Sequence, residues 1–358
     1  MVLPITFYVP LLFILHFSNE LKFSEKDIQN KKEYLVGFRY SGGYTKLKMW
    51  EIKNSKPYEV WALGSSRVLQ FRKHFFIKSF YNVGYTISQI QDFKALLSST
   101  DKEKHPKLLI VGLDQWMFNS NWARTLASKP KKNYKDFTSL SKGFSDQAQQ
   151  LFKDLIKANL EFSELLLFDE NRIGLDAKLN LKGFRKDGSM NYIKQINGLL
   201  CNSNKIKDFE YENTLDRIKK GDRRFQFGDS VNSEAVVILE DFVKFCAQYD
   251  IHIVSFLPPF AKTVNEALNN SGRHKYIFKI TPILDSLSLT YNHWDHYNFT
   301  QKGPDEEMID GFHGGELNYA KIVLSMDSAN SIFSNYVNRD SLHNLIKNRK
   351  HNYDLCDR

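Results

Sequence analysis

The chain has 358 residues, enough for one large α/β domain with an inserted region or for two smaller domains. Hydrophobic residues make up 42% of it and aromatic residues 14%, which excludes a mainly disordered protein. The formal net charge of +9 is spread over short basic pairs such as Lys131-Lys132, so we expect no nucleic acid partner. The three cysteines, Cys201, Cys246 and Cys356, lack the spacing of metal ligands and leave the redox compartment open.

The first 17 residues, MVLPITFYVPLLFILHF, carry no charged side chain and are strongly apolar. This length is the lower limit for a membrane-spanning helix, and the segment has neither a basic start nor a small-residue cleavage pattern. The first lysines, Lys22 and Lys26, follow the segment, which is the wrong side for an export anchor under the positive-inside rule. We expect residues 1–20 to be a membrane anchor or uncleaved signal rather than a buried core helix. The orientation stays open, and we expect the folded domain that follows this segment to lie on the extracytoplasmic side.

Short apolar segments that end in turn-forming residues alternate with helical patterns. Strands are predicted at YEVWAL (58–63), SFYNVGYTIS (79–88), KLLIVG (107–112) and IHIVSFLPPF (251–260), with a further short strand at LSLTYNH (287–293). Helices are predicted over VLQFRKHFF, ISQIQDFKALLSS and EAVVILEDFVKFCAQY, with a last one from about 315 to 325. GFRYSGGYTKLK is typical of a loop or a short hairpin. The alternation predicts a parallel sheet.

We therefore predict an α/β fold, a mainly parallel sheet flanked by helices with a helical insertion. The expected parts are the anchor at 1–20, the first part of the α/β domain at 21–119, a helical insertion or cap at 120–235, the second part of the domain at 236–330 and a polar tail at 331–358. Within the insertion, GFRKDGSMNY predicts a hairpin at Asp187-Gly188, with Arg185 and Asp187 holding it together.

The first predicted strand ends at Gly64, Ser65 and Ser66. A hydroxyl at the carboxyl end of a strand faces the crevice where open α/β sheets bind ligands, and the start of a following helix offers free N–H groups for negative charge. Serine is also a favoured helix N-cap, and that is the better interpretation of such a turn taken alone.

Asp310 and His313 stand three residues apart in EEMIDGFHGGELNYAKIV, just before the last predicted helix. An aspartate that binds one ring nitrogen of a histidine leaves the other free to take a proton from a serine hydroxyl. An isolated DxxH is more often a turn aspartate and a solvated histidine. Together with an early serine turn, the pair favours catalysis.

This combination resembles the SGNH, or GDSL-like, hydrolase superfamily. The resemblance implies a flavodoxin-like three-layer fold, Ser66 as nucleophile in the Gly-Ser-Ser block, His313 as base and Asp310 as its orienter. It also implies that the backbone N–H groups of Ser66 and Gly84 form the oxyanion hole. Ser65 is the nearer rival to Ser66, because a shift of one residue at a turn cannot be decided from sequence.

The third block departs from the family, which has Gly-x-Asn-Asp where this chain has Gly112-Leu113-Asp114-Gln115. Losing one oxyanion donor costs about 3 to 4 kcal/mol in an acyl-transfer enzyme, and an ionised Asp114 would repel the oxyanion. Gln115 is the candidate replacement donor. Arg67 and Trp116 are candidates for contact with substrate, although Arg67 also fits a solvated site.

The loop LDQWMF resembles the QWF loop of the D-alanyl-lipoteichoic acid transfer proteins, a membrane-anchored branch of the same superfamily that also carries Gly-Ser-Ser. The resemblance covers about 58–119 and 251–325. It implies a serine esterase or O-acyltransferase, with acetyl as the leading acyl group, acting on a cell-envelope or extracellular polysaccharide. The expected partners are an acylated carbohydrate or envelope polymer and a membrane-bound acyltransferase, and no cofactor or metal is expected. The alternative is a catalytically idle protein that binds glycan or such an acyltransferase; an exported lipase is disfavoured because 120–235 shows no long apolar lid.

Two further patterns have simpler explanations. A literal GDS occurs at 228–230, but Ser230 follows no apolar strand and better suits the start of the next helix. His293 and His296 in YNHWDHYNF look like a metal pair, yet no third ligand accompanies them, so a polar loop near the active-site crevice is expected.

Overall fold

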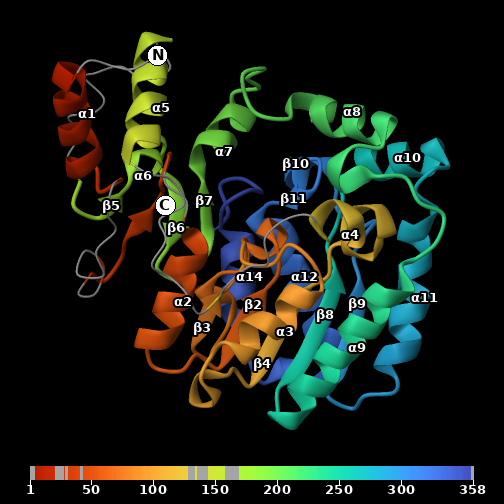
Figure 1. Ribbon diagram of the computed structural model, residues 1–358. Helices are drawn as coiled ribbons and strands as arrows, with labels where there is room; N and C mark the ends of the chain where they lie inside the picture. The colour runs from red at the N-terminus through yellow and green to blue at the C-terminus, as the bar shows by residue number, and fades with distance from the viewer. Residues whose placement is uncertain are drawn as a thin grey trace.

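The computed structural model describes residues 5–20, 28, 31–40, 43–127, 134, 144–157 and 169–355 (Figure 1). Its strands are β1 (Leu35–Val36), β2 (Val60–Leu63), β3 (Phe80–Asn82), β4 (Leu108–Gly112), β5 (Arg172–Ile173), β6 (Lys182–Arg185), β7 (Met190–Tyr192), β8 (His252–Leu257), β9 (Trp294–Asn298), β10 (Met308–Asp310) and β11 (His313–Gly314). Its helices are α1 (Ile5–Phe17), α2 (Tyr44–Asn54), α3 (Gln91–Ser98), α4 (Ser120–Ala127), α5 (Phe144–Ile156), α6 (Leu175–Asn180), α7 (Ile193–Leu200), α8 (Glu212–Lys220), α9 (Ser233–Gln248), α10 (Lys262–Ser271), α11 (Lys275–Ser288), α12 (Glu316–Ala329), α13 (Ser331–Ser334) and α14 (Arg339–Lys347).

Five strands form the central sheet, in the order β3-β2-β4-β8-β9. Every pairing in it is parallel, with Trp61 opposite Leu109 and Ile110 opposite Val254. The predicted parallel α/β architecture is therefore confirmed. Because the strands are parallel, the turns after β2, β3, β4 and β8 all lie at the same edge of the sheet.

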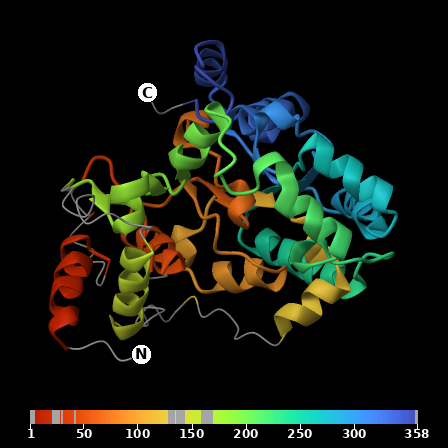
Figure 2. The same cartoon turned by 90° about the horizontal axis from the view of Figure 1, so that it is seen from above.

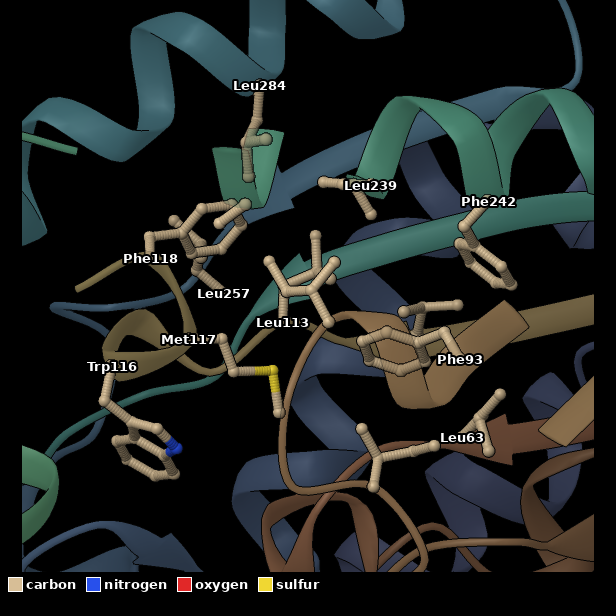
Figure 3. Close-up of a cluster of buried hydrophobic side chains, with 14 of the residues drawn as sticks. Leu63, Phe93, Leu113, Trp116, Met117, Phe118, Leu239, Phe242, Leu257 and Leu284 are labelled. Atoms are coloured by element: carbon tan, nitrogen blue, oxygen red, sulfur yellow. The ribbon is translucent and has the colours of Figure 1, made fainter. Parts of the chain in front are cut away.

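The strands bury both faces, as parallel strands do. Along β2, Trp61 and Leu63 join one hydrophobic cluster with helices α3, α9, α10 and α11 (Figure 3). Val60 and Ala62 join a second cluster with α12, α13 and α14. Successive side chains of a strand point to opposite faces, so this division follows directly from the strand geometry. The result is a sheet between two helical layers.

Several predicted elements differ from the structure. The segment 68–76 is not an α-helix but two 3₁₀ turns, Ser66–Val68 and Lys73–Phe75. The carbonyls of Val68 and Phe71 accept hydrogen bonds from the Asn82 side chain, at 2.7 and 3.0 Å, in place of helical N–H groups. The segment 287–293 is not a strand either, because α11 runs to Ser288 and the strand begins only at Trp294.

Two further segments carry more structure than the sequence predicted. The second part of the expected loop or hairpin at GFRYSGGYTKLK, from Tyr44 onward, is instead the start of α2, preceded by Gly43 in a left-handed conformation with φ 105°. The expected polar tail at 331–358 contains α13 and α14, and its side chains Phe333 and Leu342 are fully buried against the central sheet. This tail is therefore part of the domain core.

A second sheet, in the order β5-β1-β6-β7, lies beside the central domain (Figure 1). It joins β1, which comes before the serine turn, to three strands of the predicted insertion, so the segment 120–235 is a mixed structure rather than a helical cap alone. The hairpin predicted at Asp187-Gly188 is confirmed by the antiparallel pairing of β6 and β7. Part of this region, 158–168, lies outside the described residues.

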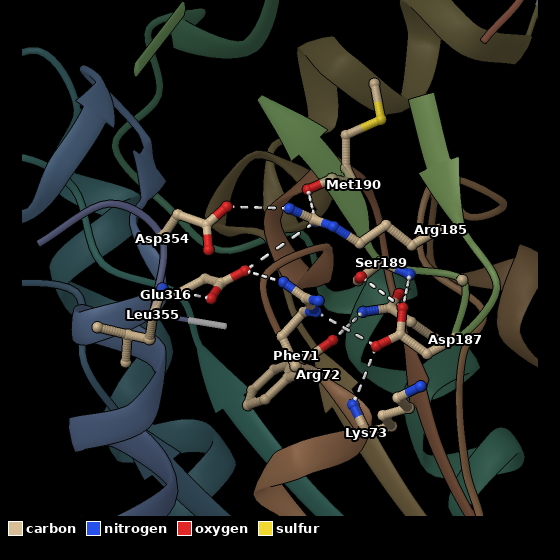
Figure 4. A network of polar contacts seen from close by, with 12 residues as sticks. Phe71, Arg72, Lys73, Arg185, Asp187, Ser189, Met190, Glu316, Asp354 and Leu355 are labelled. Atoms are coloured by element: carbon tan, nitrogen blue, oxygen red, sulfur yellow. Dashed lines mark hydrogen bonds and ion pairs between the residues drawn. The ribbon is translucent and has the colours of Figure 1, made fainter. Parts of the chain in front are cut away.

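A buried polar network fastens this hairpin to the central domain (Figure 4). Asp187 accepts hydrogen bonds from Arg72 Nε at 3.3 Å and from the Lys73 N–H at 3.0 Å. Arg72 also pairs with Glu316 of α12, and Arg185 pairs with Asp354 at 3.1 Å. Arg185 and Asp187 thus hold the hairpin against the rest of the protein, beyond stabilising its own turn.

Helix α1 packs against α5, beside the small sheet (Figures 1 and 2). Leu11 and Leu15 are buried in this contact, whereas Phe13 and Phe17 are 57% and 53% exposed. Among the described residues, none of the helices combines the length and the apolar character needed to cross a membrane.

Candidate active site

Ser66, His313 and Asp310 meet at the carboxyl edge of the central sheet. The Ser66 Oγ lies 2.8 Å from His313 Nε2. His313 Nδ1 lies 2.8 and 2.9 Å from the two carboxylate oxygens of Asp310. Ser66 follows β2, while Asp310 and His313 stand on the β10–β11 hairpin, so 247 residues of chain separate the hydroxyl from the imidazole.

The backbone fixes the protonation of this group. Asp310 Oδ1 accepts the N–H groups of Phe312 at 3.0 Å and His313 at 2.9 Å. Burial acts to raise the pKa of Asp310, but the neighbouring His313 and these hydrogen bonds outweigh it and hold that pKa below its ordinary value. An ionised Asp310 can only accept, so Nδ1 of His313 donates and Nε2 is left to accept from Ser66.

The structure distinguishes the two serines of the turn. Ser65 is buried, and its Oγ accepts the N–H of Arg67 at 3.2 Å, so Ser65 is the cap of the following 3₁₀ turn. Ser66 lines the cleft and faces His313. Ser65 thus caps the turn, whereas the Ser66 hydroxyl lies next to His313.

Three glycines surround Val68 just below this turn. A Cβ on Gly64 or Gly112 would come within 2.8 or 2.4 Å of Val68 Cγ1, and one on Gly84 within 2.6 Å of Val68 Cγ2. No real Cβ makes contacts this short. The three strand ends therefore approach Val68 more closely than any residue other than glycine allows.

Most of the predicted oxyanion donors have other partners. The Gly84 N–H donates to Asn82 Oδ1 at 2.9 Å. The Gln115 amide donates to Pro258 O at 2.8 Å and to Thr300 Oγ1 at 3.0 Å, so its expected role as replacement donor is wrong. In the described chain, only the Ser66 N–H among these groups makes no hydrogen bond to another residue.

Asp114, which directly follows Leu113 just after β4, is buried. Its Oδ1 lies 3.5 Å from Arg67 Nη1, and its Oδ2 has no hydrogen-bond partner in the described part of the chain. Burial raises its pKa, against the lowering effect of Arg67 and the Ser65 hydroxyl. Asp114 pairs with Arg67 inside the protein and does not line the cleft.

Arg67 and Trp116 are both buried, and their predicted contact with substrate is wrong. The Arg67 guanidinium donates to backbone and side-chain acceptors around it: Phe312 O at 2.9 Å, Gln115 Oε1 at 2.6 Å, Asp114 Oδ1 at 3.5 Å, Pro258 O at 2.8 Å and Pro259 O at 2.6 Å. Its charge also lies over the ring of Trp116, 5.1 Å from the centroid. Five N–H donors meet five acceptors, so no donor remains for a ligand.

The triad opens into a cleft of about 1240 Å³. Its lining includes the aromatic and basic side chains of Tyr85, Trp122, Tyr192, Arg224 and Phe312. Tyr192 comes from β7 of the second sheet, and its ring lies 6.3 Å from that of His313. The inserted region thus completes the site.

Sequence reasoning missed Tyr85, Tyr192 and Arg224. Tyr85 directly follows Gly84 and adopts φ 75°, which is unusual for a residue other than glycine. Such conformations cluster at functional sites, but no pattern in the sequence predicted this one. Arg224 is one of two adjacent arginines, and no motif distinguishes this pair from the other short basic pairs of the chain. No sequence signal pointed to Tyr192, because its place depends on how the second sheet docks.

The remaining candidates lie apart from the triad. Ser230 is exposed ahead of α9, whose N-cap is Asn232. His293 and His296 are not in a crevice loop: His296 is part of β9, where its Nδ1 lies 2.8 Å from Ser255 Oγ, and His293 precedes that strand and contacts Val243 O. The described residues contain no group of three or more His, Cys, Asp or Glu placed to hold a metal ion.

No protein family model matches this chain, and no curated protein matches its sequence. These comparisons therefore assign no function to the candidate site.

Proposed function

We propose that this protein is a serine-dependent ester hydrolase or O-acyltransferase. The observation that carries the proposal is the hydrogen-bonded series from Ser66 Oγ through the His313 ring to Asp310, with 2.8 Å at each end. This is the arrangement that activates a serine hydroxyl, because the histidine can take the proton while the aspartate stabilises the imidazolium that forms.

In this mechanism the Ser66 proton passes to His313 Nε2 as Oγ attacks the ester carbonyl. The tetrahedral intermediate collapses to an acyl-enzyme when His313 returns the proton to the leaving alcohol. Water or a sugar hydroxyl then attacks the acyl-enzyme with His313 again as base. The first acceptor gives hydrolysis and the second gives acyl transfer.

The substrate class follows from the resemblance to the anchored SGNH branch and from the cleft. We infer an acyl group, chiefly acetyl, on a cell-envelope or extracellular polysaccharide. Tyr85 is 49% exposed beside Ser66, and Trp122 and Tyr192 line the same cleft, which gives flat rings on which a sugar can stack.

From the same resemblance we infer that the domain lies on the extracytoplasmic side and is held at the membrane through the N-terminal segment. The exposed rings of Phe13 and Phe17 on α1 support a contact with lipid or with a membrane-bound acyltransferase. A flotation assay with liposomes tests this, with Phe13→Ser/Phe17→Ser as the matched variant. Equal flotation of both proteins would contradict the membrane contact.

The test of the proposed activity is labelling with a serine-reactive fluorophosphonate, together with 4-nitrophenyl acetate turnover. We expect Ser66→Ala and His313→Ala to abolish both, and Ser65→Ala to retain labelling. Folded wild-type protein that neither labels nor turns over ester would overturn the proposal.

A second candidate is a glycan-binding or partner-binding protein that uses the same cleft without catalysis. The observation that favours it is that the Gly84 N–H and the Gln115 amide are already engaged. Ser66→Ala separates the two candidates: cells that depend on a binder keep their function with this variant, and cells that depend on an enzyme lose it.

A further inference from the structure

The proposed chemistry creates a negative charge for which the described site has few donors. When Ser66 Oγ bonds to the carbonyl carbon, the C=O π electrons move to oxygen and form an oxyanion. Of the donors expected from the sequence, the Gly84 N–H is bound to Asn82 and the Gln115 amide is bound to Pro258 and Thr300. The Ser66 N–H alone would stabilise the oxyanion only weakly, because oxyanion holes commonly supply two or more hydrogen-bond donors.

Arg224 is a cation that lines the cleft together with Ser66. Within the described chain its guanidinium makes no hydrogen bond and no ion pair, and it lies over the rings of Trp116 and Phe312 at 5.2 and 5.8 Å from their centroids. Arg224 and Ser66 together line both the large cleft and a smaller hollow of about 460 Å³ that Tyr85 also lines. Ser65 and Ser88 also line the smaller hollow, whereas the buried Arg67 lines neither of the two.

The chain holds Arg224 in place through its neighbour. Phe225 is 1% exposed and packs on Phe312 at 5.9 Å between ring centroids. Phe312 in turn lies 4.5 Å from the ring of His313. The 3₁₀ turn that carries Arg224 is therefore anchored to the same hairpin as the base, which limits its movement relative to the triad.

We propose that Arg224 is a catalytic residue whose guanidinium donates to the oxyanion formed at Ser66, in the place of the asparagine that the third block lacks. The inference rests on the proposed serine chemistry. No proton leaves the guanidinium: the Ser66 proton goes to His313, and Arg224 stabilises the new negative charge electrostatically and by hydrogen bonding. Such a donor contributes only when the charge has formed, so it acts on kcat.

The test compares Arg224→Gln and Arg224→Lys with Arg223→Gln, which removes the neighbouring, 68% exposed guanidinium. The substrates are 4-nitrophenyl acetate, which is neutral, and 4-nitrophenyl hemisuccinate, which carries an anion away from the carbonyl. Thermal unfolding shows that each variant is folded. We expect Arg224→Gln to lower kcat for both esters roughly 100-fold with KM changed by less than about threefold. Arg224→Lys keeps the charge and should retain most of kcat, and Arg223→Gln should match wild type.

Three outcomes would overturn the inference. If kcat for the neutral ester stays within about threefold in Arg224→Gln, the guanidinium does not contact the oxyanion. If only KM for the anionic ester rises, Arg224 recognises a charged substituent instead. If wild type fails to label with fluorophosphonate, both the proposed function and this inference are wrong. If wild type labels and Arg224→Gln keeps the wild-type kcat, only this inference is wrong.

Discussion

Arg67 Nη1 donates to Gln115 Oε1 at 2.6 Å, inside the protein and away from the cleft. Arg67 follows β2 and Gln115 follows β4, and both bind Pro258 O after β8. Two residues that the sequence associates with substrate and oxyanion therefore hold together the ends of three neighbouring strands. Their effect on the site is to fix the turn on which Ser66 stands.

We expect Arg67→Gln to destabilise the protein strongly. The substitution leaves a buried Asp114 without its cation and several carbonyls without donors, and breaking a buried pair in this way costs about 3 to 5 kcal/mol. Urea unfolding measures the loss. Arg223→Gln is the control, with an expected change within about 0.5 kcal/mol. An equal, small effect of both substitutions would contradict the role given to Arg67.

Asp310→Asn should lower esterase kcat by a factor of at least about 100. The amide keeps an acceptor for the backbone N–H groups but favours the wrong tautomer of His313, whose Nε2 then carries the proton. Asp295→Asn is a matched control, because Asp295 binds His252 at 2.7 Å in a similar pair with no serine attached. Comparable activity in the two variants would argue against the triad.

Gly84→Ala should destabilise the fold because its Cβ would meet Val68 Cγ2 at 2.6 Å, Asn82 Oδ1 at 2.7 Å and Leu69 Cδ2 at 2.9 Å, and Val68→Ala relieves the first of these contacts. Val68→Ala removes that methyl and costs about 1 to 2 kcal/mol through the space it leaves. We expect the double variant to lose less unfolding free energy than the sum of the losses in the two single variants, because the effects of substitutions at residues in contact are often not additive. Strict additivity in urea unfolding would show that Val68 does not set the requirement for glycine.

Burial lowers the pKa of His296 from its ordinary value near 6.5 to about 3. Its Nε2 is buried without a partner in the described chain, so the folded protein disfavours the imidazolium while the unfolded chain accepts the proton. The resulting stability is complete above pH 6.5 and is lost as pH falls toward 3, by at most about 1.4 kcal/mol per pH unit.

The measurement is urea unfolding between pH 7 and pH 4.5 for wild type and His296→Phe, which has no titrating ring. As the pH falls, the free energy of unfolding should decrease more steeply in wild type than in His296→Phe. An NMR titration in which the His296 ring signals shift with a midpoint near pH 6.5 would contradict it.

The sequence determined the parts of the molecule that depend on local pattern. Buried β-branched runs that end in glycine or serine predict parallel strands, and the helices α3 and α9 follow from amphipathic segments with polar boundaries. The serine turn and the three-residue spacing of Asp310 and His313 also predict that these side chains form one site. These predictions succeed because strand ends of a parallel sheet meet at one edge.

The tertiary structure alone decided what the polar side chains do. Whether Arg67 faces a ligand or five internal acceptors, and whether Gln115 points at an oxyanion or at Pro258, depends on a rotation of one side chain that no local pattern encodes. Likewise, β1 finds its partners among strands more than 130 residues away, because the hairpin of β6 and β7 offers an edge for pairing. The sequence by itself thus indicated the serine turn, the histidine and the aspartate. Only the packing of distant segments decided which of the two serines faces His313 and which groups surround it.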